Sequence, residues 1–129
     1  MNVIIGIDPS LTGTGVATAE GLHTITSKPS DTTLTGRRAR LRTIVHELDN
    51  IVLGVKPWRF ERIPNLIVIE APSLAQKSQA GTLDRNGLWW LLVDRLHTLG
   101  IPVVEVSPST VKKFASGKGN ATKPDMRMA

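Results

Sequence analysis

The 129-residue chain contains no cysteine, which excludes disulfides, thiolate metal sites and cysteine nucleophiles. Any metal binding therefore falls to carboxylates. No apolar stretch is long enough to span a membrane, and the first residues show neither the basic region nor the cleavage site of a signal peptide. These absences predict a soluble intracellular protein with no membrane partner.

Acidic residues are in the minority, with 11 against 16 lysines and arginines, a formal charge of +5 and a pI near 10.1. The bases gather in two segments, one with Arg37, Arg38, Arg40 and Arg42, the other with Lys112, Lys113, Lys118, Lys123 and Arg127. This uneven excess predicts a polyanionic partner. For the arginine cluster, a merely solvated helix face is an equal alternative.

Two apolar runs each end in an acidic residue. Residues 3–7 are followed by Asp8, and residues 66–69 are followed by Glu70. Such runs are typical of buried strands, whose interior rejects an unpaired carboxylate at a cost of roughly several kcal/mol, whereas a strand tip accepts one. If the two strands lie side by side, both acids converge at one edge of the sheet, where a divalent cation can hold both charges.

The hydrophobic pattern predicts strands at 2–8, 15–19, 22–27, 66–70 and 103–106, and helices at 35–53, 83–99 and 107–115. Three meandering strands followed by alternating helices and strands predict a mixed α/β sheet with helices against its faces. With 40% hydrophobic and 21% charged residues, the chain is globular in composition, and its length suits a single domain.

Apolar residues recur at helical spacing in the two long helices and predict the core. They are Leu41, Ile44, Val45, Leu48, Ile51 and Val52 in the first helix and Leu88, Leu92, Leu96 and Leu99 in the second. Gly54 and Gly100 are the expected stop signals. Trp89 and Trp90 are adjacent and cannot share one face, so we expect one to pack inward. A second subunit or plain exposure would account for the other.

A polar loop follows each of the two strand-end acids, and its position predicts contact with substrate. The first loop covers residues 9–15, and its glycines permit positive φ and close backbone approach, although an ordinary hairpin turn is the alternative. The second covers residues 71–81. The contact candidates in these loops are Ser10, Thr12, Gly13, Ser73 and Lys77.

Three segments, in this order, resemble RuvC-type Holliday-junction resolvases. They are Gly6-Ile7-Asp8-Pro9-Ser10-Leu11-Thr12-Gly13-Thr14-Gly15, the strand-end Glu70, and Pro108-Ser109-Thr110-Val111-Lys112-Lys113 with the following Gly117-Lys118-Gly119-Asn120-Ala121-Thr122-Lys123. Together they span nearly the whole chain. Gly-Ile-Asp alone would carry less weight, because sugar kinases and actin-like ATPases share a similar first strand.

The resemblance implies a ribonuclease H-like fold, here a mixed five-stranded sheet flanked by helices, with residues 1–129 forming one nuclease domain. It also implies a homodimer that cuts four-way or branched DNA by paired nicks, with Mg²⁺ or Mn²⁺ as cofactor. The setting expected for such an enzyme is the cytoplasm of a bacterial or phage-infected bacterial cell.

The same resemblance assigns roles to individual residues. Asp8 and Glu70 match the metal-holding acids, and Lys112 and Lys123 match lysines that support phosphate binding and catalysis. Residues expected to contact DNA are Ser10, Thr12, Gly13, Ser73, Lys77, Lys112, Lys113, Lys118 and Lys123. For Lys113 and Lys118, plain surface exposure is the alternative.

The chain departs from the family pattern in two places. Further acids come from a C-terminal helix in the family, whereas only Asp125 follows Lys123 here, so we expect the domain to lack that helix. The segment 71–74 has no aromatic residue where relatives place one for stacking into the junction. Two alternatives follow: a dimer that binds branched DNA without cutting it, or a related nuclease that acts on RNA.

Overall fold

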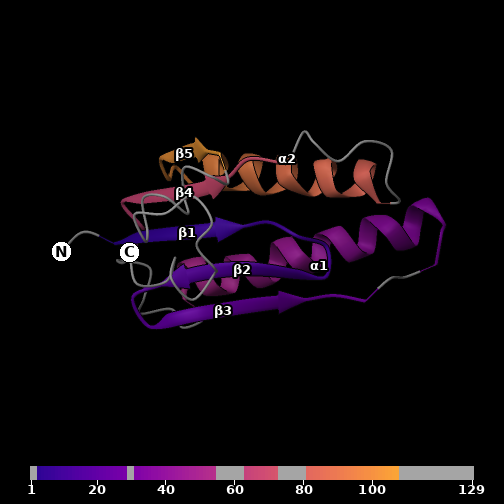
Figure 1. Cartoon of the computed structure of the whole chain (residues 1–129), viewed down its shortest axis with the longest axis horizontal. Helices are drawn as coiled ribbons and strands as arrows, with labels where there is room; N and C mark the ends of the chain where they lie inside the picture. The colour runs from indigo at the N-terminus through magenta and orange to yellow at the C-terminus, as the bar shows by residue number, and fades with distance from the viewer. Residues whose placement is uncertain (1–2, 29–30, 55–62, 73–80, 108–129) are drawn as a thin grey trace.

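The computed structural model describes residues 3–28, 31–54, 63–72 and 81–107, and the fold of this part is shown in Figure 1. Its elements are β1 (Ile4–Asp8), β2 (Gly13–Thr18), β3 (Gly21–Thr26), α1 (Leu34–Leu53), β4 (Leu66–Glu70), α2 (Thr82–Thr98) and β5 (Val103–Val106). The expected order of these seven elements is confirmed, with boundaries that differ by no more than a few residues. The helix predicted at 107–115 falls almost entirely outside the described residues.

The five strands form one mixed sheet in the order β3-β2-β1-β4-β5. Antiparallel hairpins join β1 to β2 and β2 to β3, while β1, β4 and β5 are parallel neighbours. Parallel neighbours need long crossovers, which here contain α1 and α2. The expected mixed α/β sheet is therefore confirmed, and within the described ranges no helix combines the length and apolarity needed to cross a bilayer.

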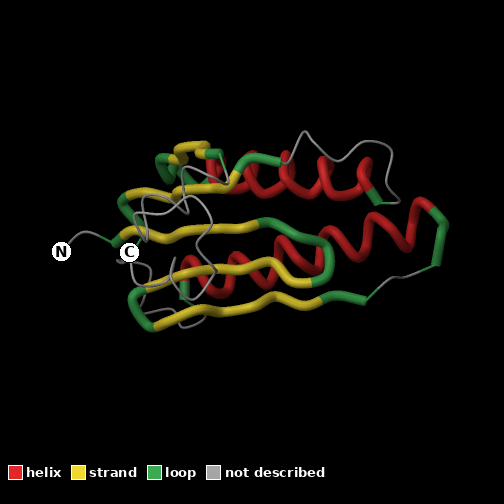
Figure 2. The backbone as a smooth tube through the Cα atoms, in the orientation of Figure 1, coloured by secondary structure: helices red, strands yellow, loops and turns green. Residues whose placement is uncertain are grey.

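The core lies between one face of the sheet and the two helices, which Figure 2 shows alongside each other. Alternate strand residues are buried, and they meet the helix stripes that the sequence predicts. The buried apolar side chains are Ile5, Ile7, Val16, Ile25, Ile67 and Ile69 from the sheet, and Ile44, Leu48, Val52, Leu88, Trp89, Leu92 and Leu96 from the helices. Both described helices therefore cover the same face.

The helix ends follow the predicted signals. Gly54 has φ 70° and Gly100 has φ 79°, the left-handed region that ends a helix and favours glycine. The tryptophan pair divides as expected, because Trp89 is buried and the Trp90 side chain is 65% exposed. Their rings meet edge to face, with centroids 4.9 Å apart.

One expectation about glycine is wrong. Gly13 and Gly15 are not turn residues with positive φ but members of β2, paired with Thr26 and Thr24 of β3. Within the described residues, positive φ occurs at Gly21, Gly54, Gly81 and Gly100. The sheet overrides local preference here, since ladder pairing with β3 extends the strand back to Gly13 and confines the loop to residues 9–12.

Candidate active site

The two strand-end acids lie on neighbouring strands. β1 and β4 are parallel, and their register pairs Ile7 with Ile69, so one further step sets Asp8 beside Glu70. Adjacent strands are about 4.8 Å apart, which is close enough for two carboxylates to share bound cations. The adjacency on which the sequence argument depends is present.

Alternation along the strands fixes which face holds these acids. Ile7 and Ile69 are buried against the helices, so the next residue of each strand, Asp8 and Glu70, belongs to the opposite face. Both acids are partly exposed. They therefore share one face and one edge of the sheet, away from the helix layer.

The acid pair is flanked by one residue on each adjoining strand. Asp8 pairs with Gly15 of β2, and Glu70 pairs with Val106 of β5. Because glycine has no side chain, nothing projects from β2 over the Asp8 side of the pair at this level. Gly15 itself is buried, whereas Asp8, Glu70 and Val106 are each partly exposed.

The loop after Asp8 is held in shape by Thr14. Its hydroxyl donates to the carbonyl of Ser10 at 2.6 Å and accepts from the Ser10 N–H at 3.1 Å. The Ser10 hydroxyl in turn accepts from the Gly13 N–H at 3.3 Å. Thr14 is fully buried, whereas Ser10 is partly exposed and Thr12 exposed. The loop thus presents hydroxyls beside the acids from an internally bonded frame.

Two supporting residues were missed by sequence reasoning. Thr14 belongs to the quoted motif but was not singled out, although a hydroxyl close behind a turn often bonds back to the backbone. Trp89 donates its indole N–H to the main-chain carbonyl of Glu70 at 3.0 Å. The sequence did indicate such a bond, because one of the two adjacent tryptophans is expected to pack inward and a buried indole N–H usually has an acceptor.

The arginine cluster divides between structural and exposed side chains. Arg37 of α1 makes a two-pronged ion pair with Asp84 of α2, with Nη2 to Oδ1 at 2.6 Å and Nε to Oδ2 at 2.9 Å. These hydrogen bonds lower the pKa of Asp84. Arg40 bonds within the protein as well, whereas Arg38 and Arg42 are exposed. The cluster is therefore only in part a solvated face.

The structure brings together some of the predicted site residues. Asp8, Glu70, Ser10, Thr12 and Gly13 lie at or beside the carboxyl ends of β1 and β4. The remaining candidates fall outside the described residues, and they are Ser73, Lys77, Lys112, Lys113, Lys118 and Lys123. Among the described side chains, no group of three or more acids or histidines is placed to hold a metal ion.

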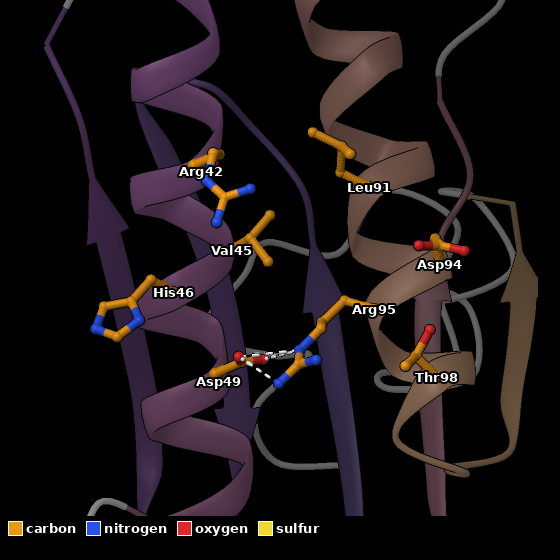
Figure 3. Close-up of a pocket in the computed structure, with 8 residues that line it drawn as sticks. All are labelled: Arg42, Val45, His46, Asp49, Leu91, Asp94, Arg95 and Thr98. Atoms are coloured by element: carbon orange, nitrogen blue, oxygen red, sulfur yellow. Dashed lines mark hydrogen bonds and ion pairs between the residues drawn. The ribbon is translucent and has the colours of Figure 1, made fainter.

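A groove of about 480 Å³ lies elsewhere, between α1 and α2. Its lining residues are Arg42, Val45, His46, Asp49, Leu91, Asp94, Arg95 and Thr98. Figure 3 shows Arg95 and Asp49 bridging the helices, with Arg95 Nη2 and Asp49 Oδ2 3.0 Å apart. Because the groove belongs to the helix layer, it is separate from the acids on the opposite face of the sheet.

Comparisons with known proteins agree with this geometry. No protein-family model matches the chain. The crossover junction endodeoxyribonuclease RuvC of Nocardia farcinica is 30% identical over 122 residues, which cover 93% of this chain and 62% of that protein. RuvC of Cutibacterium acnes is 33% identical over 123 residues, covering 93% of this chain and 60% of that protein. The chain thus spans about three fifths of the length of these curated relatives.

Solved structures give the same result for the fold. The structure of Thermus thermophilus RuvC matches with a TM-score of 0.65 and 20% identity, covering 95% of this chain and 74% of that one. RuvC of the same species in complex with a Holliday junction substrate matches with a TM-score of 0.61 and 21% identity, covering 98% of this chain and 75% of that one.

The sheet order, the two covering helices and these structural matches define a ribonuclease H-like fold. In sequence the chain is similar to RuvC crossover junction endodeoxyribonucleases over 93% of its length, the resemblance that its motifs predict.

Proposed function

We propose that this protein is a metal-dependent endonuclease that resolves Holliday junctions and related branched DNA by paired phosphodiester hydrolysis. The observation that carries the proposal is the parallel register of β1 and β4, which sets Asp8 beside Glu70, both partly exposed, on the face opposite the helices. The similarity to RuvC over 93% of the chain supports the choice of substrate. We expect it to act in a bacterial or phage-infected bacterial cytoplasm.

In this proposal, Asp8 and Glu70 hold Mg²⁺, or Mn²⁺ in its place. Carboxylate oxygens are the ligands that these hard cations prefer, and waters and phosphate oxygens commonly complete the shell of Mg²⁺, so two protein ligands are compatible with binding. When bound, the metal activates a water and stabilises charge on the phosphate oxygens. The protein's own part is to fix both carboxylates on one face before substrate arrives.

Other residues bind and orient the DNA. The hydroxyls of Ser10 and Thr12 are beside Asp8, where they can donate to phosphate oxygens, and Gly13 supports the contact because its N–H donates to the Ser10 hydroxyl. Lys112 and Lys123 are assigned to the scissile phosphate, where an ammonium offsets charge that grows in the transition state. The DNA contacts assigned outside the catalytic centre are Ser73, Lys77, Lys113 and Lys118.

We further propose a homodimer, because paired nicks need two copies of the site. The outer side of α2 carries large apolar side chains that the fold leaves uncovered: Leu83 is 75% exposed, Trp90 65% and Leu91 42%. Leu83 and Trp90 are seven residues apart, which puts them on one face of the helix. Packing α2 against its symmetry mate would bury this face.

The dimer is tested with the Trp90→Glu variant by sedimentation and by the nicking pattern. We expect monomers and loss of the paired second nick, with an unchanged circular dichroism spectrum. The matched control is Val104→Glu, which places the same charge at a 47% exposed apolar residue of β5 and should leave the protein dimeric in sedimentation. A Trp90→Glu variant that stays dimeric would refute the assignment of this face.

The nuclease is tested by incubating the full chain with Mg²⁺ and labelled four-way junction, linear duplex and RNA–DNA hybrid. We expect symmetric nicks in the junction that are lost in Asp8→Asn and in Glu70→Gln. Glu47→Gln, an exposed acid on α1, is the matched control and keeps wild-type cutting. Equal cutting by the wild type and both site variants would reject the proposal.

A second candidate is a dimer that binds branched DNA without cutting it. Among the described residues no third acid joins Asp8 and Glu70 in a possible metal group, and this favours the binding function. The same assay separates the nuclease from the binding dimer, because the binding dimer would bind the junction and release no product. Its affinity for the junction would fall steeply as the salt concentration rises. Preferential cutting of the hybrid would indicate an RNA-directed nuclease instead.

A further inference from the structure

Arg40 of α1 reaches across the structure to two other segments. Its Nε donates to the hydroxyl of Ser27 at 2.8 Å, just after β3. Its Nη2 donates to the carbonyls of Leu11 and Ser27, both at 3.4 Å. The Ser27 hydroxyl donates to the carbonyl of Leu11, which closes the network. One guanidinium therefore joins a helix, the end of a strand and the loop after Asp8.

Leu11 is the third residue of the loop at 9–12, between Ser10 and Thr12. The bonds between Thr14 and Ser10 make this loop an internally fixed unit, but they do not connect it to the helix layer. The hydrogen bonds from Arg40 and Ser27 to the Leu11 carbonyl make that connection. On its other side, the Leu11 side chain lies against Gly81, where a Cβ would come within 3.4 Å of it.

These contacts distinguish Arg40 from its neighbours in the arginine cluster. Arg37 is occupied by Asp84, and Arg38 is exposed. Arg40 is partly buried and directs its Nε and Nη2 at protein acceptors, so the pair of donors that would grip a phosphate in bidentate fashion is already engaged. Arginine suits such a task because its fork presents several donors in fixed geometry, whereas lysine offers a single compact charge.

From this network we propose that Arg40, together with Ser27, is a positioning residue that fixes the loop at 9–12 beside Asp8. The expected effect of Arg40 on DNA cleavage rests on the proposed function. In that function the loop holds the Ser10 and Thr12 hydroxyls where the DNA backbone meets the two acids. Small displacements of a positioned group reduce turnover more than binding.

The test compares Arg40→Lys, which keeps the charge, and Ser27→Ala with the full wild-type chain. The first measurement is amide hydrogen exchange at Ser10 and Gly13, whose N–H groups are bonded inside the loop. We expect exchange there to accelerate several-fold in both variants, while helix amides and circular dichroism stay as in the wild type. Ser27→Thr retains a hydroxyl and restores protection.

The second measurement is junction cleavage. A positioning role predicts that kcat falls about tenfold in Arg40→Lys with KM little changed, whereas loss of a phosphate contact would mainly raise KM. Arg38→Gln is the control for charge on the same helix and leaves loop exchange at the wild-type rate.

Unchanged loop exchange in Arg40→Lys would overturn the proposal, and so would an equal acceleration in Arg38→Gln. If the wild-type chain neither binds nor cuts junctions, the proposed function fails, but the exchange measurement still decides whether Arg40 and Ser27 fix the loop. The two failures are therefore distinguishable.

Discussion

The indole N–H of Trp89 donates a 3.0 Å hydrogen bond to the main-chain carbonyl of Glu70, the last residue of β4. Trp89 is buried on α2, so a side chain from the helix layer bonds to the backbone of the residue whose carboxylate belongs to the opposite face. Through this contact, the hydrophobic core determines where one of the two acids is held.

Replacing Trp89 with phenylalanine removes this bond while keeping an apolar ring. The Glu70 carbonyl then loses this hydrogen bond, and removing the donor to a partly buried acceptor costs about 1–3 kcal/mol. We expect urea denaturation to show a loss of that size, with weaker cleavage as a consequence. Trp90→Phe changes an exposed ring and should be nearly neutral for stability; an equal loss in both variants would contradict the role of the bond.

Thr14→Val keeps the shape of the side chain and its preference for strands but removes the hydroxyl that bonds to Ser10. We expect a loss of about 1–3 kcal/mol, because the N–H and carbonyl of Ser10 both lose a partner. Chemical denaturation measures this loss in the free energy of unfolding. Thr12→Val is the control, since Thr12 is exposed and its hydroxyl lies at the long distance of 3.5 Å from the Ser10 hydroxyl. Equal stabilities of the two variants would show that Thr14 does not hold the loop.

The ion pair between Arg37 and Asp84 predicts a pH-dependent contribution to stability. Arg37 lowers the pKa of Asp84 in the folded protein, so the contribution is fully present above the unfolded pKa of about 3.9 and is lost as the pH falls through the lower folded pKa. The urea midpoint difference between wild type and Asp84→Asn should therefore be constant above about pH 5 and shrink below about pH 4.

A double-mutant cycle isolates this pair. In an Arg37→Gln background, Asp84→Asn should have an effect that no longer changes over the same acidic range, because the partner that lowers the Asp84 pKa is gone. If the pH dependence persists in that background, it arises from groups other than Arg37.

The sequence predicted the elements because each has a strong local pattern: aliphatic runs for β1 and β4, and helical stripes ending at Gly54 and Gly100. The predicted start of β2 was wrong. Gly13 belongs to the strand because it pairs with Thr26 of β3, and local sequence preferences carry no information about that pairing.

The candidate site was predictable only in part. The two acids stand out because strand ends tolerate charge, but their register requires pairing between residues about 60 positions apart, as between Ile7 and Ile69. The bonds from Trp89 to Glu70 and from Arg40 to Leu11 join distant segments too. Such contacts are set by packing of the whole fold, which no local pattern encodes.

Mg²⁺ should stabilise the folded protein if Asp8 and Glu70 hold it. A ligand at 100 times its Kd adds about 2.7 kcal/mol when it binds only the native state, which corresponds to a rise in Tm of several degrees for a domain of this size. We expect this rise in the wild type, its reversal by EDTA, and its loss in Asp8→Asn and Glu70→Gln. Glu47→Gln, with the same change in charge on α1, should keep it. A rise that survives in both site variants would mean that the cation binds elsewhere, and the nuclease assignment would lose its metal centre.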